Sequence, residues 1–223
     1  MYMPSHFEEG EVAVIRGIIA DNPLATLVAH TDEGLVANHL PVLFDPSARD
    51  HSGSMETSVL IGHVAAANDL HRMLADGAKV LLIFHGEDSY VSPNWYPTKP
   101  RHHRHVPTWN YQVVHVHGRI FFQHDDKSKR AIVGHLTKHF ETATNGDKAW
   151  KMADAPADFM LDMVQNIVGF QINIDTVQAK SKLSQNREME DYDNVAHELE
   201  AKGLNRLASR MRYPKGDPAA GLD

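Results

Sequence analysis

The sequence contains no cysteine among its 223 residues. Disulfide scaffolding, thiolate nucleophiles and cysteine-ligated metal sites are therefore excluded. Long apolar runs are missing as well, because no stretch approaches the roughly 18 residues that a membrane span requires. The opening stretch "MYMPSHFEEGE" is acidic and does not resemble a basic leader. These absences predict a cytoplasmic protein with no membrane partner.

The chain also lacks a surplus of basic residues and the common catalytic motifs. Its formal net charge of -7 argues against a wide basic surface, although a local patch could still contact nucleic acid. The motifs G-x-S-x-G, H-E-x-x-H, G-x-G-x-x-G and the phosphate-binding loop do not occur, so no catalytic residue stands out. The length fits one domain, or one domain with a helical appendage.

Histidine is unusually common, with 16 residues. His115 and His117 share one strand face at a spacing of roughly 7 Å, which can chelate a metal. His102, His103 and His105 follow closely in "HHRH". No carboxylate is placed as a third ligand and the intervening arginine repels a cation, so we predict no metal site and leave the roles of these histidines open.

Hydrophobic periodicity indicates a mainly β protein with flanking helices. We expect helices at residues 6–23, at 66–77, after Asp125, near 155–163 and on both sides of Gly203. Strands are expected at 24–30, 34–44, 58–64, 78–86, after Gln112 and at 167–180, with a loop at 45–57 and an irregular stretch at 86–109. Because there is no strict βαβ rhythm, the predicted fold is α+β, with an antiparallel sheet closed into a barrel.

The strand after Gln112 has two different faces, because successive side chains alternate. One face is apolar and looks like core: Val114, Val116, Ile120 and Phe122, with Gly118 as a gap. The other is mixed: Val113, His115, His117, Arg119 and Phe121. Solvent exposure explains such a face as well as a partner or a ligand does.

Two stretches could hold an anionic, ring-containing ligand. Donors suited to a phosphoester lie between a strand and a helix: Lys180, Lys182, Ser184, Gln185, Asn186 and Arg187. Aromatic residues beside polar ones suit a flat heteroaromatic ring: Ser92, Asn94, Trp95, Thr108, Trp109 and Asn110. The alternatives are an ordinary helix cap in the first stretch, and tryptophans that plug the end of a barrel in the second.

Several separated motifs together resemble one known family. "MYMPSHF", "ANHLPVLFD", "GHVAAAN", "YVSPNWY", "VPTWNY" and "KLSQNR" occur in this order, and the whole is similar to the PaiB-type FMN-binding negative transcriptional regulators. The resemblance implies a split β-barrel of the pyridoxamine-phosphate-oxidase-like kind over residues 1–187, usually a homodimer with FMN at the subunit interface. It also implies a helical tail, residues 188–223, packed on the barrel with its last residues disordered.

The same resemblance suggests roles for individual residues. The FMN phosphate would lie among Lys182, Ser184, Gln185, Asn186 and Arg187. The isoalloxazine would be approached by His39, Ser92, Trp95, Trp109 and Asn110. The face of His115 and His117 would turn toward the dimer partner or the flavin.

The residues support DNA binding less well than they support flavin binding. The tail helix "REMEDYDNVAHELE" is acidic and would repel phosphates, and no convincing helix-turn-helix is present. One basic patch comprises Lys202, Arg206, Arg210, Arg212 and Lys215, and a second comprises Arg101 and Arg104. A flavin-dependent oxidoreductase on the same barrel, and a haem-binding protein with an axial histidine, remain open alternatives.

Overall fold

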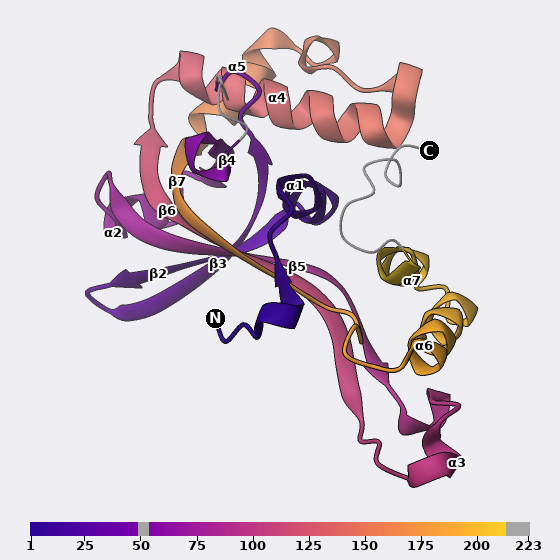
Figure 1. Ribbon diagram of the computed structural model, residues 1–223. Helices are drawn as coiled ribbons and strands as arrows, with labels where there is room; N and C mark the ends of the chain where they lie inside the picture. Colours follow the sequence, from indigo (N-terminus) through magenta and orange to yellow (C-terminus); the bar gives the residue numbers. More distant parts are fainter. Residues whose placement is uncertain (49–53, 213–223) are drawn as a thin grey trace. The chain divides into compact units, whose positions relative to one another are not determined.

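The computed structural model describes residues 1–48 and 54–212 (Figure 1). Lys215, the expected disordered end and part of the expected loop at 45–57 lie outside the described residues. The chain forms two compact units. The barrel unit comprises Pro23–Ile83 and Val116–Val177, and the helical unit comprises Met1–Asn22, Phe84–His115 and Gln178–Asp223.

The barrel unit is built from antiparallel strands. Its strands are β2 (Leu24–Thr31), β3 (Gly34–Phe44), β4 (Val59–Ala65) and parts of β5 (Ala78–Val91), β6 (Thr108–Gln123) and β7 (Ile167–Lys182). Together with β1 (Glu8–Glu9) they are hydrogen-bonded in the order β1-β7-β4-β3-β2-β5-β6. Since β6 also pairs with β7, the sheet closes on itself. The predicted antiparallel barrel with flanking helices is confirmed.

The hairpin of β2 and β3 forms where the turn residues predict it. Thr31 pairs with Gly34, and Gly34 has a φ of 108°, which a residue without a Cβ adopts readily. The interior of the unit is fully buried and aliphatic or aromatic: Leu27, Leu60, Leu82, Ile120, Phe170 and Ile172. Burial of such side chains is the main stabilising contribution to folding.

Strand β6 shows the expected alternation of faces. Val114, Val116 and Ile120 are fully buried, whereas His117 and Arg119 are exposed. Gly118 interrupts the apolar face because a Cβ there would lie 2.5 Å from the carbonyl oxygen of Asn173. Glycine is therefore required by the close approach of backbone in the barrel unit.

Helices cover part of the barrel unit. They are α2 (Leu70–Met73), α4 (Asp126–Asn145) and α5 (Ala157–Gln165). Asp125 caps α4 by accepting the Ser128 N–H at 2.9 Å, as predicted, and Ile132 and Leu136 pack with Ile61.

The helix expected at 66–77 was predicted too long. Only Leu70–Met73 is helical. The Asn68 side chain accepts the N–H of Leu70 and thereby fixes a start inside the predicted range, and Gly77 turns the chain with a φ of 81°.

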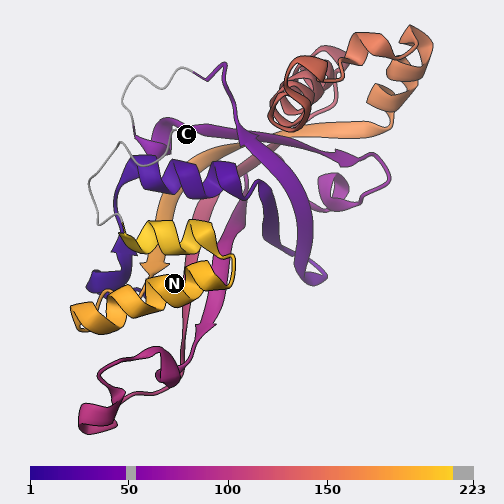
Figure 2. The same ribbon diagram turned by 90° about the vertical axis from the view of Figure 1, so that its right-hand side faces the viewer.

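The helical unit consists of helices packed beside the remaining strand segments (Figure 2). Its helices are α1 (Val12–Asp21), α3 (Lys99–His102), α6 (Met189–Ala201) and α7 (Asn205–Arg212). The helix predicted at 6–23 is wrong at its start: α1 begins only at Val12, because Glu8 and Glu9 pair with β7 as strand β1 instead. Its end at Asn22 is as predicted, and so is Gly203, with a φ of 77°, as the break between α6 and α7. The tail helices share a buried cluster with Val91 and Tyr96.

The irregular stretch expected at 86–109 is shorter than predicted, because β5 continues to Val91 and β6 begins at Thr108. Short 3-10 turns occur at Ser5–Phe7, Met55–Thr57, Pro93–Trp95, Gly146–Lys148 and Met152–Asp154. Among the described residues, no helix combines the length and the apolar character needed to cross a membrane.

Candidate cofactor site

In the helical unit, one face of β5, β6 and β7 carries aromatic and lysine side chains. We call the set of Tyr90, Trp109, Tyr111, Lys180 and Lys182 the outer face. Alternation places Trp109 and Tyr111 on one side of β6, and Lys180 and Lys182 on one side of β7. Contacts join the three strands, because the Tyr90 and Trp109 rings meet edge to face and the Lys180 Nζ lies 5.3 Å from the Tyr111 ring centroid.

Lys180 and Lys182 place positive charge close to aromatic rings. Lys180 is only 7% exposed, and its Nζ lies 5.7 Å from the ring centroid of Tyr2 and 6.0 Å from that of Phe7. The Lys182 Nζ donates to Thr108 Oγ1 at 2.6 Å and to the Trp109 carbonyl at 2.5 Å. These acceptors are neutral, so they leave the charge of Lys182 uncompensated.

The pKa of Lys182 is lowered, first by burial and then by the charges of Lys180 and Arg187. Partial removal from water disfavours the ammonium form, and two nearby cations disfavour it further. An anion bound at Lys182 would relieve both effects. The local electrostatics therefore favour a negatively charged ligand.

The aromatic part of the outer face is open to solvent. Tyr90 is 44% exposed and Trp109 is 52% exposed, with their ring centroids 6.0 Å apart. Exposed large aromatic rings beside cationic groups are typical of surfaces that bind a ligand or a partner. Tyr90 and Tyr111 lie in the motifs "YVSPNWY" and "VPTWNY" but were not named among the predicted contacts, although the alternation of β6 places Tyr111 on the side of Trp109.

Several residues that were predicted to contact the cofactor form hydrogen bonds within the protein, in the turn after β7. Ser184 has a φ of 64°, is buried, and donates its hydroxyl to Asn110 Oδ1 at 2.9 Å. Gln185 accepts the Leu183 N–H at 2.7 Å and donates to the Ser181 carbonyl at 2.6 Å. These bonds hold the end of β7 in place. Contact of Ser184, Gln185 and Asn110 with a cofactor stays a prediction.

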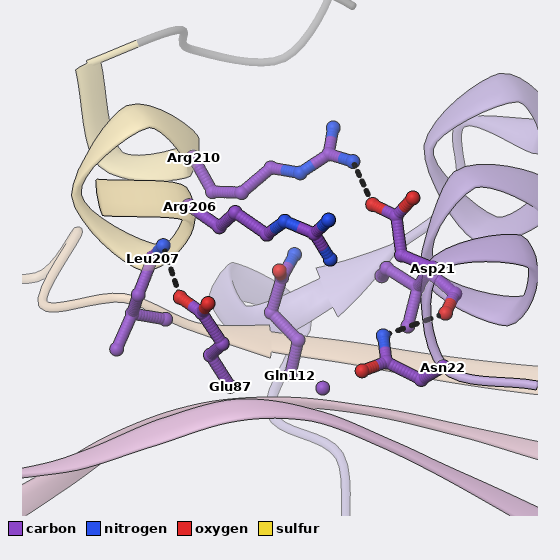
Figure 3. Close-up of a pocket in the computed structure, with 9 residues that line it drawn as sticks. Asp21, Asn22, Glu87, Gln112, Arg206, Leu207 and Arg210 are labelled. Atoms are coloured by element: carbon purple, nitrogen blue, oxygen red, sulfur yellow. Dashed lines mark hydrogen bonds and ion pairs between the residues drawn. The ribbon is translucent and has the colours of Figure 1, made fainter. Parts of the chain in front are cut away.

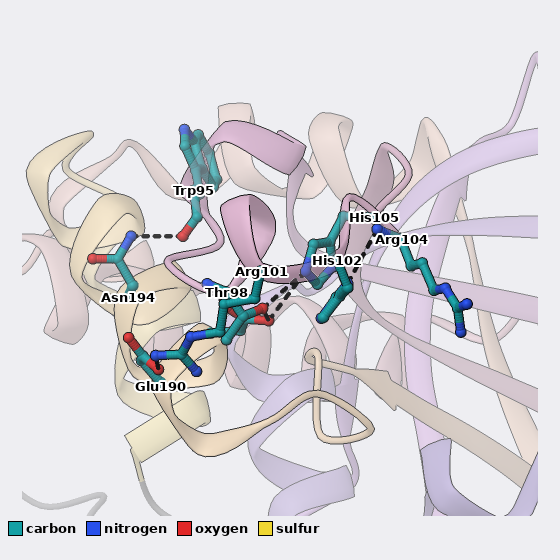
Figure 4. A network of polar contacts seen from close by, with 9 residues as sticks. Trp95, Thr98, Arg101, His102, Arg104, His105, Glu190 and Asn194 are labelled. Carbon is teal, nitrogen blue, oxygen red and sulfur yellow. Dashed lines mark hydrogen bonds and ion pairs between the residues drawn. The ribbon is translucent and has the colours of Figure 1, made fainter.

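The other predicted contacts of this unit lie in different surroundings. The Arg187 guanidinium carbon lies 5.0 Å from the Tyr96 ring centroid, and Asn186 is exposed. Ser92 caps the turn at Pro93–Trp95 by accepting the Asn94 N–H. The Trp95 carbonyl accepts from the Asn194 amide of α6 at 2.6 Å (Figure 4). Their role in flavin binding also stays a prediction.

The histidines are distributed over both units. In the barrel unit, His39 is exposed on β3 with its Nδ1 3.1 Å from Thr26 Oγ1. Burial lowers the pKa of His63. Within residues 1–48 and 54–212, no group of three or more histidine, cysteine, aspartate or glutamate residues is arranged to hold a metal.

A buried polar network fixes the segment between β5 and β6 to α6 (Figure 4). Asp191, 1% exposed, accepts the Thr98 N–H at 3.1 Å and the Thr98 hydroxyl at 2.7 Å. The Thr98 oxygen lies 2.9 Å from His105 Nε2. Because the Thr98 hydroxyl donates its hydrogen to the Asp191 carboxylate, the Thr98 oxygen can only accept from His105, whose Nε2–H is then the hydrogen-bond donor.

A shallow depression in the helical unit was not predicted from the sequence (Figure 3). Its volume is only about 20 Å³, and its charged lining comprises Asp21, Glu87, Arg206 and Arg210. Asp21 pairs with Arg210 at 3.8 Å, and Glu87 accepts the Leu207 N–H at 2.8 Å. Balanced charges that hold α7 against α1 and β5 explain these residues without a ligand.

The fold and the lysine-bearing face define the class of protein: a split β-barrel with an anion-compatible aromatic surface. Residues 1–176 match the family model described as "Putative FMN-binding domain". The chain belongs to this FMN-binding family, and FMN is the cofactor that the family assignment supports.

Sequence relatives extend over nearly the whole chain. The chain is 31% identical over 201 residues to the Bacillus subtilis "Protease synthase and sporulation protein PAI 2", covering 90% of this chain and 89% of that protein. It is 30% identical over 235 residues to an uncharacterized protein of Emericella nidulans, with 92% of each chain covered. The predicted resemblance to the PaiB family is thereby confirmed.

Solved structures show the same fold at low sequence identity. The flavocytochrome Anf3 from Azotobacter vinelandii is similar with a TM-score of 0.58 and 12% identity, over 83% of this chain and 74% of that chain. The FAD and heme binding protein from Mycobacterium smegmatis is similar with a TM-score of 0.55 and 16% identity, over 85% and 79% of the two chains. Both comparisons support the split-barrel architecture.

Proposed function

We propose that the outer face binds FMN, and that the protein acts as a cytoplasmic, homodimeric transcriptional regulator of the PaiB type. The observation that carries the binding site is the charge of Lys182. Its Nζ lies within 2.6 Å of two neutral acceptors, and burial and neighbouring cations destabilise its charge. A phosphate would compensate that charge.

The donor chemistry of the outer face fits both ends of FMN. Lys182, with Lys180 on the same side of β7, would hold the phosphate. The exposed rings of Trp109 and Tyr90 would give the isoalloxazine an aromatic surface. When bound, FMN supplies hydride chemistry. The turn of Ser184 and Gln185 would act as a positioning element, because it fixes the chain directly after Lys182.

The exposed aromatic rings also support the dimer. A ring as large as the indole of Trp109, 52% exposed, gains free energy when a second surface covers it. We therefore expect a second copy of the chain to complete the flavin site. Sedimentation equilibrium should give twice the chain mass of 25.0 kDa, and a monomer that retains FMN would contradict this part of the proposal.

A comparison of FMN with riboflavin tests the site most directly, because riboflavin lacks the phosphate. Lys182→Gln should weaken FMN binding at least tenfold and leave riboflavin binding within about twofold, since a charge-assisted hydrogen bond is worth about 1.5–3 kcal/mol. Trp109→Ala should weaken both ligands, because it removes a stacking surface rather than a charge. Flavin fluorescence titration measures all four affinities.

The matched control removes positive charge elsewhere. Lys127→Gln with Arg130→Gln changes two exposed cations of α4 in the barrel unit. This variant should bind FMN like the wild type. If Lys182→Gln lowers FMN and riboflavin affinity equally, or changes neither, the proposed phosphate position is wrong. A Soret band in the protein as isolated would favour haem instead of flavin.

A further inference from the structure

The segment between β5 and β6 concentrates positive charge at one place in the helical unit. Residues 92–107 contain Lys99, Arg101 and Arg104 but no acidic residue, in a chain with a net charge of -7. We call residues 99–104 the basic apex. Arg101, His102, His103 and Arg104 are all exposed, and Lys99 is half-buried.

The backbone of the basic apex is a short helix closed by a left-handed residue. Helix α3 ends at His102, and His103, which caps it, has a left-handed φ of 54°. The Arg104 N–H donates to His102 Nδ1 at 3.1 Å. Figure 4 shows the Arg104 side chain extending away from the buried network, and Arg104 is exposed.

Polar contacts join the basic apex and the residues just before it to helix α6. Buried bonds join Thr98 to Asp191 and the Trp95 carbonyl to Asn194, both residues of α6. Arg101 forms an ion pair with Glu190 at 2.8 Å. A surface held in this way loses little conformational entropy when it binds, which favours its use as a contact site.

The charges of the apex are only partly compensated. Glu190 neutralises Arg101, but the Lys99 Nζ donates to the neutral amide of Asn94 at 2.5 Å. Lys202 of α6 lies with its Nζ 5.4 Å from the Trp95 ring centroid, at the base of the same segment. Lys99, Arg104 and Lys202 form no ion pair with an acidic residue in the part of the chain that the structure describes.

We propose that the basic apex contacts backbone phosphates of duplex DNA. Guanidinium and ammonium groups on a surface turn suit phosphate oxygens, and such contacts position a protein on DNA without reading its sequence. This inference rests on the proposed regulator function and identifies the surface through which it would act. The acidic helix α6 does not serve as the contact itself and instead supports the apex.

Counterion release sets the size of the expected effect. Each phosphate neutralised contributes about 0.9 to the slope of log K against log salt on duplex DNA. Removing Lys99 and Arg104 should therefore lower the magnitude of that slope by about 2. The loss of affinity should be similar for different duplex sequences, because phosphate contacts carry no base information.

The experiment compares three full-length proteins by fluorescence anisotropy with a labelled random-sequence duplex at several salt concentrations. The apex variant is Lys99→Gln with Arg104→Gln, and the matched control is Lys127→Gln with Arg130→Gln, which removes the same charge from α4. We expect at least tenfold weaker binding and the reduced slope for the apex variant alone. FMN titration of each protein verifies the cofactor site independently.

The outcomes separate the two proposals. Equal weakening by both variants, or no binding of the wild type to the duplex, would overturn the apex contact even if FMN binds normally. If the wild type does not bind FMN, the cofactor proposal is wrong, and the DNA contact is judged from the anisotropy data alone. Binding of the wild type to vesicles with anionic headgroups, but not to the duplex, would assign the apex to a membrane surface and refute the DNA contact.

Discussion

Thr98→Val tests whether the buried network holds the basic apex to α6. Valine keeps the shape of threonine, but it removes the hydroxyl that donates to Asp191 at 2.7 Å and accepts from His105 at 2.9 Å. The Asp191 carboxylate is 1% exposed, so water cannot replace the lost donor. The amide of Thr98 still donates to Asp191, which limits the loss to part of the network.

The expected cost follows from these two bonds. A hydrogen bond to a charged group contributes about 1.5–3 kcal/mol and a neutral one about 1 kcal/mol. We therefore expect Thr98→Val to lower the free energy of unfolding by about 3 kcal/mol. For a chain of this length, that corresponds to a decrease of about 6–12 °C in Tm.

Urea denaturation followed by circular dichroism measures the change, and hydrogen exchange reports on the segment itself. Exchange should become faster between Tyr96 and His105, whose segment loses its anchor. Thr98→Ser keeps the hydroxyl and should cost less than about 1 kcal/mol. Thr142→Val, the same substitution at an exposed position of α4, should have almost no effect. A Thr98→Val protein as stable as the Thr142→Val control would refute the reasoning.

Three further predictions concern the cofactor site and the backbone. Burial lowers the pKa of Lys182 and a bound phosphate would raise it again, so FMN affinity should fall as pH rises through the lowered pKa. Titration from about pH 7 to 10 checks this, and Lys182→Gln should flatten the profile. Gly118→Ala should cost about 1–3 kcal/mol in urea denaturation, because its Cβ would meet the Asn173 carbonyl at 2.5 Å. Ser184→Ala should be less stable than Ser184→Gly by thermal unfolding, because both lose the bond to Asn110 but only glycine relaxes the φ of 64°.

Local signals in the sequence predicted much of the barrel. The hairpin of β2 and β3, the cap at Asp125 and the break at Gly203 depend on residues within a few positions of one another, and all three were correct. The two faces of β6 were also predictable, because alternation is a property of any strand. The starts of α1 and α2 were predicted wrongly, since pairing of Glu8 and Glu9 with β7 and the hydrogen bond from the Leu70 N–H to the Asn68 side chain overrode the helical pattern.

The candidate site could be predicted only in part. Lys182 and Trp109 stood out as a cation and an aromatic ring in separate motifs, but their contact depends on the pairing of β6 with β7. Tyr90 begins the motif "YVSPNWY", but only its ring contact with Trp109 across two strands brings it into the site. Ser184 has a hydroxyl that would suit contact with a phosphate, but the structure buries this residue in a turn.

The sequence by itself determined the alternating faces, the caps and the turns, because each follows from neighbours along the chain. Only the tertiary structure decided which polar groups form hydrogen bonds within the protein and which remain available to a ligand or a partner. Ser184 meets Asn110 across 74 positions, and Thr98 meets Asp191 across 93. Pairings at such separations depend on how strands and helices close around a shared core, and no local pattern encodes them.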